Sequence, residues 1–156
     1  MKRVIHYTAI SLVFIGATVV NAFAADAVTG VPYPVAAKVL QLANTGDLKS
    51  QTRLGLMYSK GTGVPQDYYE AAKWYYRAAN RGDPFAQYAL GMMYNKGQGV
   101  RRDYVLAEMW LNLSASRTVG ENRDFVARVR DAVASKMTAE QLATAQRLAV
   151  AWYQSP

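Results

Sequence analysis

The feature that most constrains this chain is an internal repeat with a period of 36 residues. Residues 46–79 align with residues 82–115, and sixteen of the 34 aligned positions are identical. A period of this length is typical of arrays in which each unit buries its apolar face against the next unit. We therefore expect a stack of repeated units.

Within each copy the pattern predicts two helices, and no strand is indicated. Apolar residues recur at helical spacing over 48–60 and 68–81, and over 84–96 and 104–117 in the second copy. The predicted fold class is all-α, an alpha-alpha superhelix in which helix-turn-helix repeats form a solenoid.

The chain divides into six predicted segments. They are a signal peptide (1–24), an irregular leader (25–33), a partial repeat helix (34–45), the first repeat (46–81), the second repeat (82–117) and two longer C-terminal capping helices (118–156). A solenoid needs an atypical end to cover its last apolar face, and the C-terminal helices suit that role. Thr138 and Gln141 predict a capping box at the start of the last helix.

An aspartate precedes each of the four repeat helices. These residues are Asp47, Asp67, Asp83 and Asp103. Helix capping explains them better than acid–base catalysis, because catalysis needs groups that converge on one point. Glu70 follows Asp67 by three residues and predicts an acidic form of the capping box.

The conserved spacing within the chain reads LGxMYxKGxGVxxDYxxAxxW in both copies. This motif resembles the Sel-1-like repeat family, a relative of the tetratricopeptide repeats, over Gly46 to Ala115. The segment MTAEQLATAQRLA also looks like the closing helix of small exported bacterial members. The resemblance implies a right-handed helical superhelix that binds another protein, and it names no partner.

The N-terminus has the features of a secretory signal peptide. A positively charged start is followed by an apolar run over 8–20 and by small residues at Ala22 and Ala24. We expect cleavage after Ala24 or Ala25, and a periplasmic or secreted protein that meets the membrane only during export. An uncleaved anchor is the alternative, although the run is shorter than the roughly 20 residues of a membrane span.

Composition excludes several kinds of chemistry from the processed chain. The only histidine, His6, lies in the signal, and the chain has no cysteine. Zinc held by His or Cys, a Ser-His-Asp triad, a cysteine nucleophile and disulfides are therefore excluded. The full sequence has a net charge of +7, of which Lys2 and Arg3 are removed with the signal, and the remaining basic residues are interspersed with acidic ones, which does not indicate nucleic-acid binding. We expect no cofactor and no metal.

The Lys-Gly-x-Gly turns invite comparison with phosphate-binding loops. Such a loop places its lysine after the glycines and normally follows a strand, whereas Lys60 precedes Gly61 and Gly63. The same turn recurs at Gly97 and Gly99. We expect these glycines to supply positive-φ turns at the corners of the repeat, and not to bind a ligand.

The recurring residues form the predicted structural core of the repeat. They are Leu54, Gly55, Tyr58, Gly61, Gly63 and Trp74 in the first copy, and Leu90, Gly91, Tyr94, Gly97, Gly99 and Trp110 in the second. Tyr68 and Tyr104 are assigned to the core as well, because recurring aromatic residues usually bury large areas. Gly55 and Gly91 lie inside helices, where glycine costs about 1 kcal/mol against alanine, so we expect close helix–helix approach there.

Residues that do not recur are better candidates for a partner-binding surface. They are Tyr69, Lys73, Tyr76, Tyr88, Met92, Arg101 and Arg102. An exposed face with aromatic residues and methionine suits a helix or peptide partner, and contact with the leader or the terminal helices is an equal alternative. The two arginines lie in an inter-helix loop, where they meet an acidic partner or solvent.

The favoured function is an exported protein–protein interaction module, an adaptor, scaffold or regulator in the bacterial envelope, and not an enzyme. Two alternatives stay open: an envelope enzyme acting on cell-wall or β-lactam substrates, and a subunit of a larger envelope assembly. Relatives that have been linked to cell-wall or β-lactam chemistry are cysteine-rich, whereas this chain has no cysteine. It also has no Ser-x-x-Lys arrangement, and both facts disfavour the enzyme.

Overall fold

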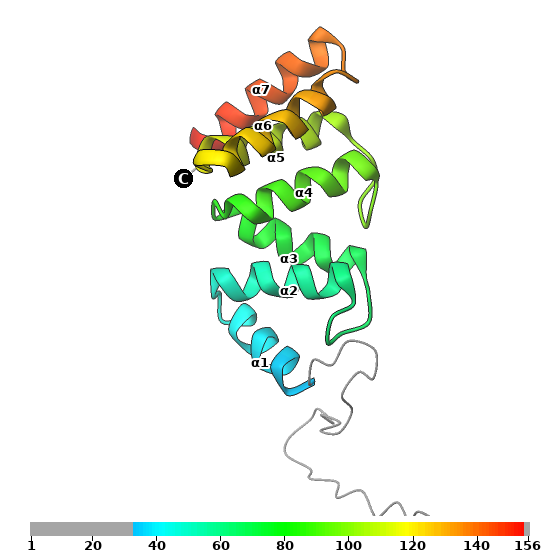
Figure 1. Cartoon of the computed structure of the whole chain (residues 1–156), viewed down its shortest axis with the longest axis vertical. Coiled ribbons are helices and arrows are strands. Elements are labelled where there is room, and N and C mark those ends of the chain that lie inside the picture. The colour runs from blue at the N-terminus through cyan, green and yellow to red at the C-terminus, as the bar shows by residue number, and fades with distance from the viewer. Residues whose placement is uncertain (1–32, 155–156) are drawn as a thin grey trace, which may run out of the picture.

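The computed structural model describes residues 33–154, which form seven helices and no strand. The helices are α1 (Tyr33–Asn44), α2 (Leu48–Lys60), α3 (Tyr68–Asn80), α4 (Pro84–Lys96), α5 (Tyr104–Arg117), α6 (Gly120–Ala134) and α7 (Ala139–Gln154). They are stacked along the long axis of the molecule, from α1 at one end to α6 and α7 at the other (Figure 1). The predicted all-α repeat fold is confirmed. The predicted signal peptide lies outside the described residues.

The four aspartates cap the repeat helices as predicted. Asp47 and Asp83 accept hydrogen bonds from the backbone N–H groups of the residues three positions on, each at 2.7 Å. The Asp67 carboxylate accepts from the N–H groups of Tyr69 and Glu70 at 2.9 and 3.0 Å. Asp103 caps α5 through the N–H of Leu106 at 3.0 Å. Each cap satisfies a backbone donor that has no partner inside its helix.

The expected capping box at Asp67 is wrong in its second half. The Glu70 carboxylate does not return to the Asp67 N–H but pairs with the Lys73 ammonium group at 2.6 Å. The Asp67 N–H donates instead to the carbonyl oxygen of Tyr58 at 2.9 Å. This backbone bond closes the loop between α2 and α3, so no donor is left for a capping box.

The glycine turns are confirmed as structural corners. Gly61 and Gly97 end α2 and α4 with φ of 69° and 72°, and Gly63 and Gly99 follow with φ of 72° and 69°. A Cβ atom on Gly99 would lie 2.0 Å from the carbonyl oxygen of Tyr68. The turn between α4 and α5 therefore packs directly on the start of α3, and only glycine fits there.

Close helix–helix approach at the mid-helix glycines is confirmed. A Cβ atom on Gly55 would lie 2.7 Å from Cδ1 of Tyr75 in α3. A Cβ atom on Gly91 would lie 2.9 Å from Cγ of Leu111 and 3.1 Å from the carbonyl oxygen of Ala107, both in α5. Each glycine thus sets the distance between the two helices of its own repeat.

A buried glutamine joins each repeat to the preceding helix. The side-chain amide of Gln51 donates to the carbonyl oxygen of Ala43 at the end of α1, at 3.2 Å. Gln87 donates in the same way to the carbonyl oxygen of Ala79 at the end of α3, at 3.1 Å. Each of these carbonyl oxygens also accepts the backbone N–H of the glycine three residues on, Gly46 at 3.1 Å and Gly82 at 2.9 Å, so the glutamine adds a second bond that links two helices.

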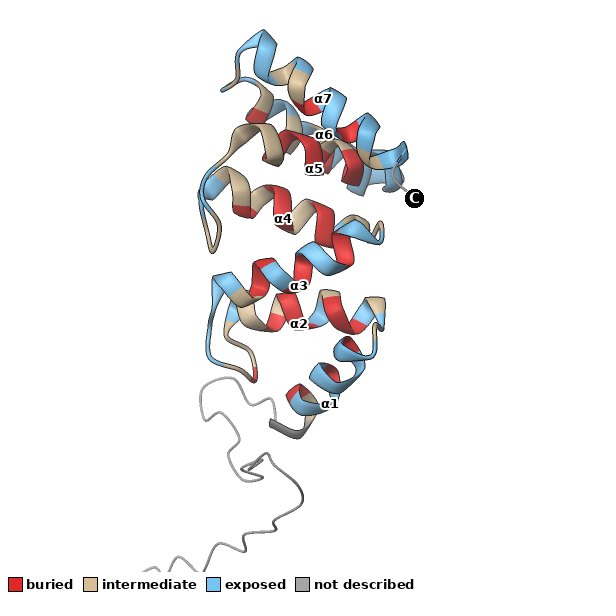
Figure 2. Ribbon diagram, turned by 180° about the vertical axis from the view of Figure 1, so that it is seen from behind, coloured by how far each residue is buried: buried red, intermediate tan, exposed pale blue. Residues whose placement is uncertain are grey.

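The C-terminal helices close the stack on α5. α6 and α7 both pack against α5 but make little contact with each other, whereas the two helices of each repeat pack closely. α5 consequently carries buried residues on several sides, whereas much of α1, α6 and α7 is exposed (Figure 2). The predicted capping box of α7 is confirmed, because Thr138 and Gln141 exchange hydrogen bonds at 2.9 and 3.2 Å.

The recurring residues differ in how deeply they are buried. Leu54, Leu90, Trp74 and Trp110 are buried, whereas Tyr58 and Tyr94 are only partly buried. Assignment of Tyr68 to the core is wrong, because its side chain is 36% exposed. Tyr68 is the first residue of α3, where its hydroxyl accepts a hydrogen bond from the Gln66 side-chain amide at 3.1 Å.

Candidate functional site

A groove of about 350 Å³ opens between α3 and α4, where the first repeat meets the second. Its walls are formed by side chains of α3 and by Tyr94 of α4, and its floor by Ala72, Leu90 and Val100. The α3 side chains are Tyr69, Lys73, Tyr76 and Arg77. Three of the seven predicted partner-binding residues, Tyr69, Lys73 and Tyr76, therefore lie together in one groove.

The aromatic side chains of this groove are exposed to solvent. Tyr69 is 63% exposed and Tyr76 is 50% exposed, whereas Leu90 on the floor is only 1% exposed. Tyr76 is held edge-on to Trp110 of α5, with ring centroids 6.2 Å apart. The groove thus presents large rings at its rim above a recessed apolar floor.

Two cations project from α3 beside these rings. The Lys73 ammonium lies 5.5 Å from the Tyr69 ring and pairs with Glu70. Hydrogen bonding to Glu70 raises the pKa of Lys73, so its charge is retained at neutral pH. The Arg77 guanidinium stacks over the buried Trp74 ring at 4.5 Å, which fixes its position while leaving its N–H groups available.

The second repeat has no open groove at the equivalent place. Val105, Met109 and Asn112 stand one period after Tyr69, Lys73 and Tyr76. Met109 is buried in the same cluster as Ala149 of α7. The C-terminal helices therefore cover this face of α5, whereas the equivalent face of α3 stays exposed.

Tyr88 and Met92 do not belong to this groove. Tyr88 packs against the cluster between α5 and α6, and its ring lies 5.8 Å from that of Phe125 in α6. It lines a separate recess of about 360 Å³ with Phe85 and Phe125. The expectation of one surface uniting Tyr69, Tyr76 and Tyr88 is therefore wrong, because α6 packs where Tyr88 projects. Met92 is half-buried in α4.

Arg101 and Arg102 are exposed in the loop that follows Val100. The Arg102 guanidinium lies 5.7 Å from the Tyr104 ring, which also has the Lys136 ammonium at 5.5 Å. Neither arginine forms an ion pair with a carboxylate in residues 33–154. The loop thus places two cations directly after Val100, which lines the floor of the groove.

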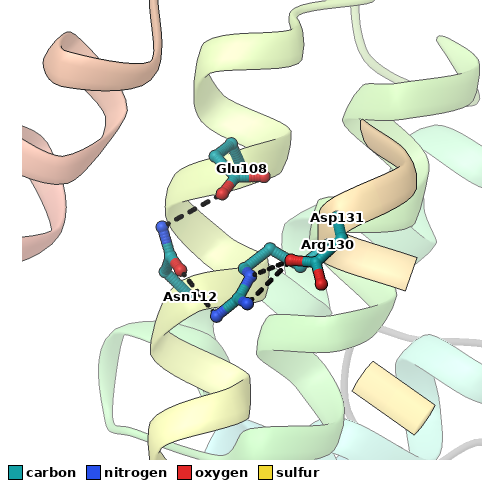
Figure 3. A network of polar contacts seen from close by, with 4 residues as sticks. All are labelled: Glu108, Asn112, Arg130 and Asp131. Atoms are coloured by element: carbon teal, nitrogen blue, oxygen red, sulfur yellow. Dashed lines mark hydrogen bonds and ion pairs between the residues drawn. The ribbon is translucent and has the colours of Figure 1, made fainter. Parts of the chain in front are cut away.

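A buried carboxylate, Glu108, is a feature that the sequence patterns do not reveal. Glu108 of α5 is 4% exposed, and its Oε1 accepts a hydrogen bond from Asn112 at 3.3 Å. Arg130 of α6 donates to the Asn112 side-chain oxygen at 3.4 Å and pairs with Asp131 at 2.7 Å (Figure 3). The second oxygen of Glu108, Oε2, has no hydrogen-bond partner among the described residues.

The environment of Glu108 changes its acidity. Burial raises the pKa of Glu108 to about 7, and the positive charge of Arg130 opposes this only in part. The alignment of the two repeats contains one usable signal, since Glu108 stands at the position of Ala72, which is buried. A charged residue at a position where the other copy is apolar and inward-facing indicates a buried charge.

Among residues 35–154, no group of three or more histidine, cysteine, aspartate or glutamate side chains is placed to hold a metal ion. None of the described helices combines the length and apolar character that crossing a membrane requires.

These features define a helical-repeat protein built from stacked helix pairs. The chain belongs to the Sel1 repeat family, whose model matches residues 48–83 and 84–118. A Sel1 repeat protein from Oxalobacter formigenes is 38% identical with a TM-score of 0.54, over 58% of this chain and 68% of that one. Proteins with this repeat are in general scaffolds for protein–protein interaction.

A second solved structure is similar over more of the chain. It is a protective antigen of uropathogenic Escherichia coli strains that displays an SLR fold, 31% identical with a TM-score of 0.72 over 78% of this chain. The chain spans 26% of the length of that antigen. No curated protein matches the sequence.

Proposed function

We propose that this protein is an exported interaction module of the bacterial envelope, which binds another protein through the groove between α3 and α4. One observation carries the proposal: Tyr69 and Tyr76 stay exposed over a recessed apolar floor at a place where the second repeat is covered by its own C-terminal helices. Exposed aromatic rings beside an apolar pocket are the usual anchors of protein interfaces. The role is that of an adaptor, a regulator or a subunit of a larger assembly.

The binding site is tested by photo-crosslinking in intact cells. A photoreactive phenylalanine analogue replaces Tyr69 or Tyr76, and in a control strain it replaces Phe125, which is equally aromatic and 48% exposed on α6. We expect a specific cross-linked partner from the two α3 positions, and loss of that partner in a Tyr69→Ser/Tyr76→Ser variant. Cross-linking from Phe125 alone would place the interface at the other recess and contradict the proposal.

Export is tested separately on the native chain. The proposal expects a mature N-terminus after Ala24 or Ala25 in the protein recovered from the envelope fraction, as measured by intact mass. A full-length chain that fractionates with the inner membrane would instead indicate a retained anchor. Concentration-dependent light scattering distinguishes a monomeric adaptor from a self-assembling subunit.

A further inference from the structure

The groove between α3 and α4 is rich in hydrogen-bond donors that have no partner. The hydroxyl groups of Tyr69, Tyr76 and Tyr94 make no hydrogen bond to any residue in 33–154. Lys73 and Arg77 can only donate. Burial raises the pKa of Tyr94, so its hydroxyl keeps its proton at neutral pH. A ligand that matches this lining supplies acceptors.

The charge around the groove is one-sided. Lys73 and Arg77 lie in the lining, Arg101 and Arg102 follow Val100, and no carboxylate lines the groove. The nearby carboxylates are already engaged: Asp67 and Asp103 accept backbone N–H groups at the starts of α3 and α5, and Glu70 pairs with Lys73. Glu70 thus compensates the charge of Lys73, whereas Arg77, Arg101 and Arg102 form no ion pair within the described part of the chain.

The shape of the groove favours an inserted side chain over a flat surface. Leu90 and Ala72 on the floor are 1% and 5% exposed, below rings that rise to the rim. A lipid bilayer would meet the rim and leave this floor uncovered. The volume of about 350 Å³ has room for one or two side chains, at the low end of the roughly 300–1,000 Å³ of small-molecule pockets.

We propose that the groove between α3 and α4 binds an acidic segment of a partner protein, with one or two apolar side chains on the floor and flanking Asp or Glu carboxylates on Lys73 and Arg77. The phenol hydroxyls of the rim donate to the remaining carboxylate oxygens. This inference rests on the proposed function and adds the chemistry of the partner. Charge-assisted bonds of this kind set specificity and speed association.

The test uses a displayed library of random twelve-residue peptides selected on the full chain. We expect the enriched peptides to be net negative, with Asp or Glu on either side of an aromatic or aliphatic residue. An Arg77→Gln variant should weaken their binding about tenfold, as expected for loss of one partly desolvated charge pair. Raising the salt concentration should weaken binding as well. Arg128→Gln is the matched control, since Arg128 is exposed on α6.

The outcomes separate the two proposals. Enriched peptides that are neutral or basic, yet lose binding in Tyr69→Ser/Tyr76→Ser, would overturn the acidic partner and leave the proposed function standing. Absence of enrichment, or binding insensitive to both sets of substitutions, would overturn the acidic partner and count against the groove as a protein-binding site. Vesicles of phosphatidylglycerol and phosphatidylcholine form a further arm. Binding of these vesicles through Arg77 without peptide binding would replace the partner with a membrane.

Discussion

Glu108 links the acidity of a single side chain to the stability of the whole fold. Its carboxyl group is buried in α5, where Asn112 is its one hydrogen-bond partner and the charged groups that act on it, Arg130 and Asp131, both lie on α6. The uncharged form fits this surrounding better than the charged form, because burial penalises charge. The raised pKa of about 7 expresses that preference.

The stability of the protein should consequently depend on pH through Glu108. The pKa of its carboxyl group rises from 4.5 to about 7 on folding, so the unfolded chain releases the proton more readily. The contribution of Glu108 to the free energy of unfolding is therefore largest below pH 4.5 and falls, by an amount on the order of 2 kcal/mol, as the pH rises through 7. Glu108→Gln should abolish this fall and raise the Tm at pH 8, measured by circular dichroism between pH 4 and 8.

An exposed carboxylate provides the comparison. Asp124→Asn on the outer side of α6 should leave the pH profile of the Tm unchanged. A Glu108→Gln variant that keeps the wild-type pH profile would show that Glu108 is not the titrating group.

At the scale of single elements, the pairing of α4 with α5 depends on the absence of a side chain. A Cβ atom placed on Gly91 would lie 2.9 Å from Cγ of Leu111 and 3.1 Å from the carbonyl oxygen of Ala107. The leucine can shift, whereas the backbone carbonyl moves only if the helix moves. The loss of helix propensity at this glycine, about 1 kcal/mol, is offset by the closer packing.

Gly91→Ala should therefore destabilise the protein although alanine is the better helix former. We expect a decrease of about 1–3 kcal/mol in the free energy of unfolding, as is typical of overpacked interfaces, measured by urea denaturation. Lys96→Ala in the same helix is exposed and should change stability by less than about 0.5 kcal/mol. A variant at Gly91 as stable as the wild type would mean that α5 shifts away without loss of packing.

The helices also show which structural features can be predicted from a repeated sequence. Helix bounds, aspartate caps and glycine turns are predictable because both copies need the same local geometry, and identity between the copies identifies the residues concerned. The capping box predicted for Asp67 and Glu70 does not form completely. It requires a free N–H on Asp67, and this N–H already donates to the carbonyl oxygen of Tyr58. That bond depends on how the loop closes, which spacing alone does not specify.

In the candidate site, too, local spacing is predictable from the sequence, whereas packing between distant segments is not. Tyr69, Lys73 and Tyr76 share a face of one helix, so their proximity follows from helical spacing. Tyr88 was expected on the same surface, but its surroundings depend on the path of α6, which lacks the repeat motif. Arg77 and Tyr94 line the groove as well and were not predicted to do so. Tyr94 was assigned to the core because it recurs, whereas Arg77 does not recur, since Leu113 stands one period later, and the same criterion could have identified it.

For the whole molecule, the position of α7 closes the stack. Trp152 of α7 lies edge-on to Trp110 of α5, with ring centroids 6.4 Å apart, and its ring has the Arg117 guanidinium at 4.9 Å. Its indole N–H donates to the Asn80 side chain of α3 at 3.4 Å. α7 thus packs on the second repeat, to which α5 belongs, and reaches α3 of the first repeat through Trp152.

Trp152→Ala should weaken the entire stack and not only its C-terminal end. We expect a loss of about 2 kcal/mol in the free energy of unfolding, less than for a fully buried tryptophan because Trp152 is only partly buried. Urea unfolding followed by circular dichroism and by the fluorescence of the remaining tryptophans should show one shared transition. Val150→Ala, at an exposed position of α7, is the control. Separate transitions would show that α7 does not couple the repeats.

The glutamine bonds between repeats have a consequence for growth by gene duplication. A third copy of residues 82–117 inserted after residue 81 would find its glutamine facing the carbonyl oxygen of Ala79, as Gln87 does now. It would bring its own aspartate caps and glycine turns, and α6 and α7 would still cover the last α5. The structure therefore permits lengthening of this protein between its two repeats.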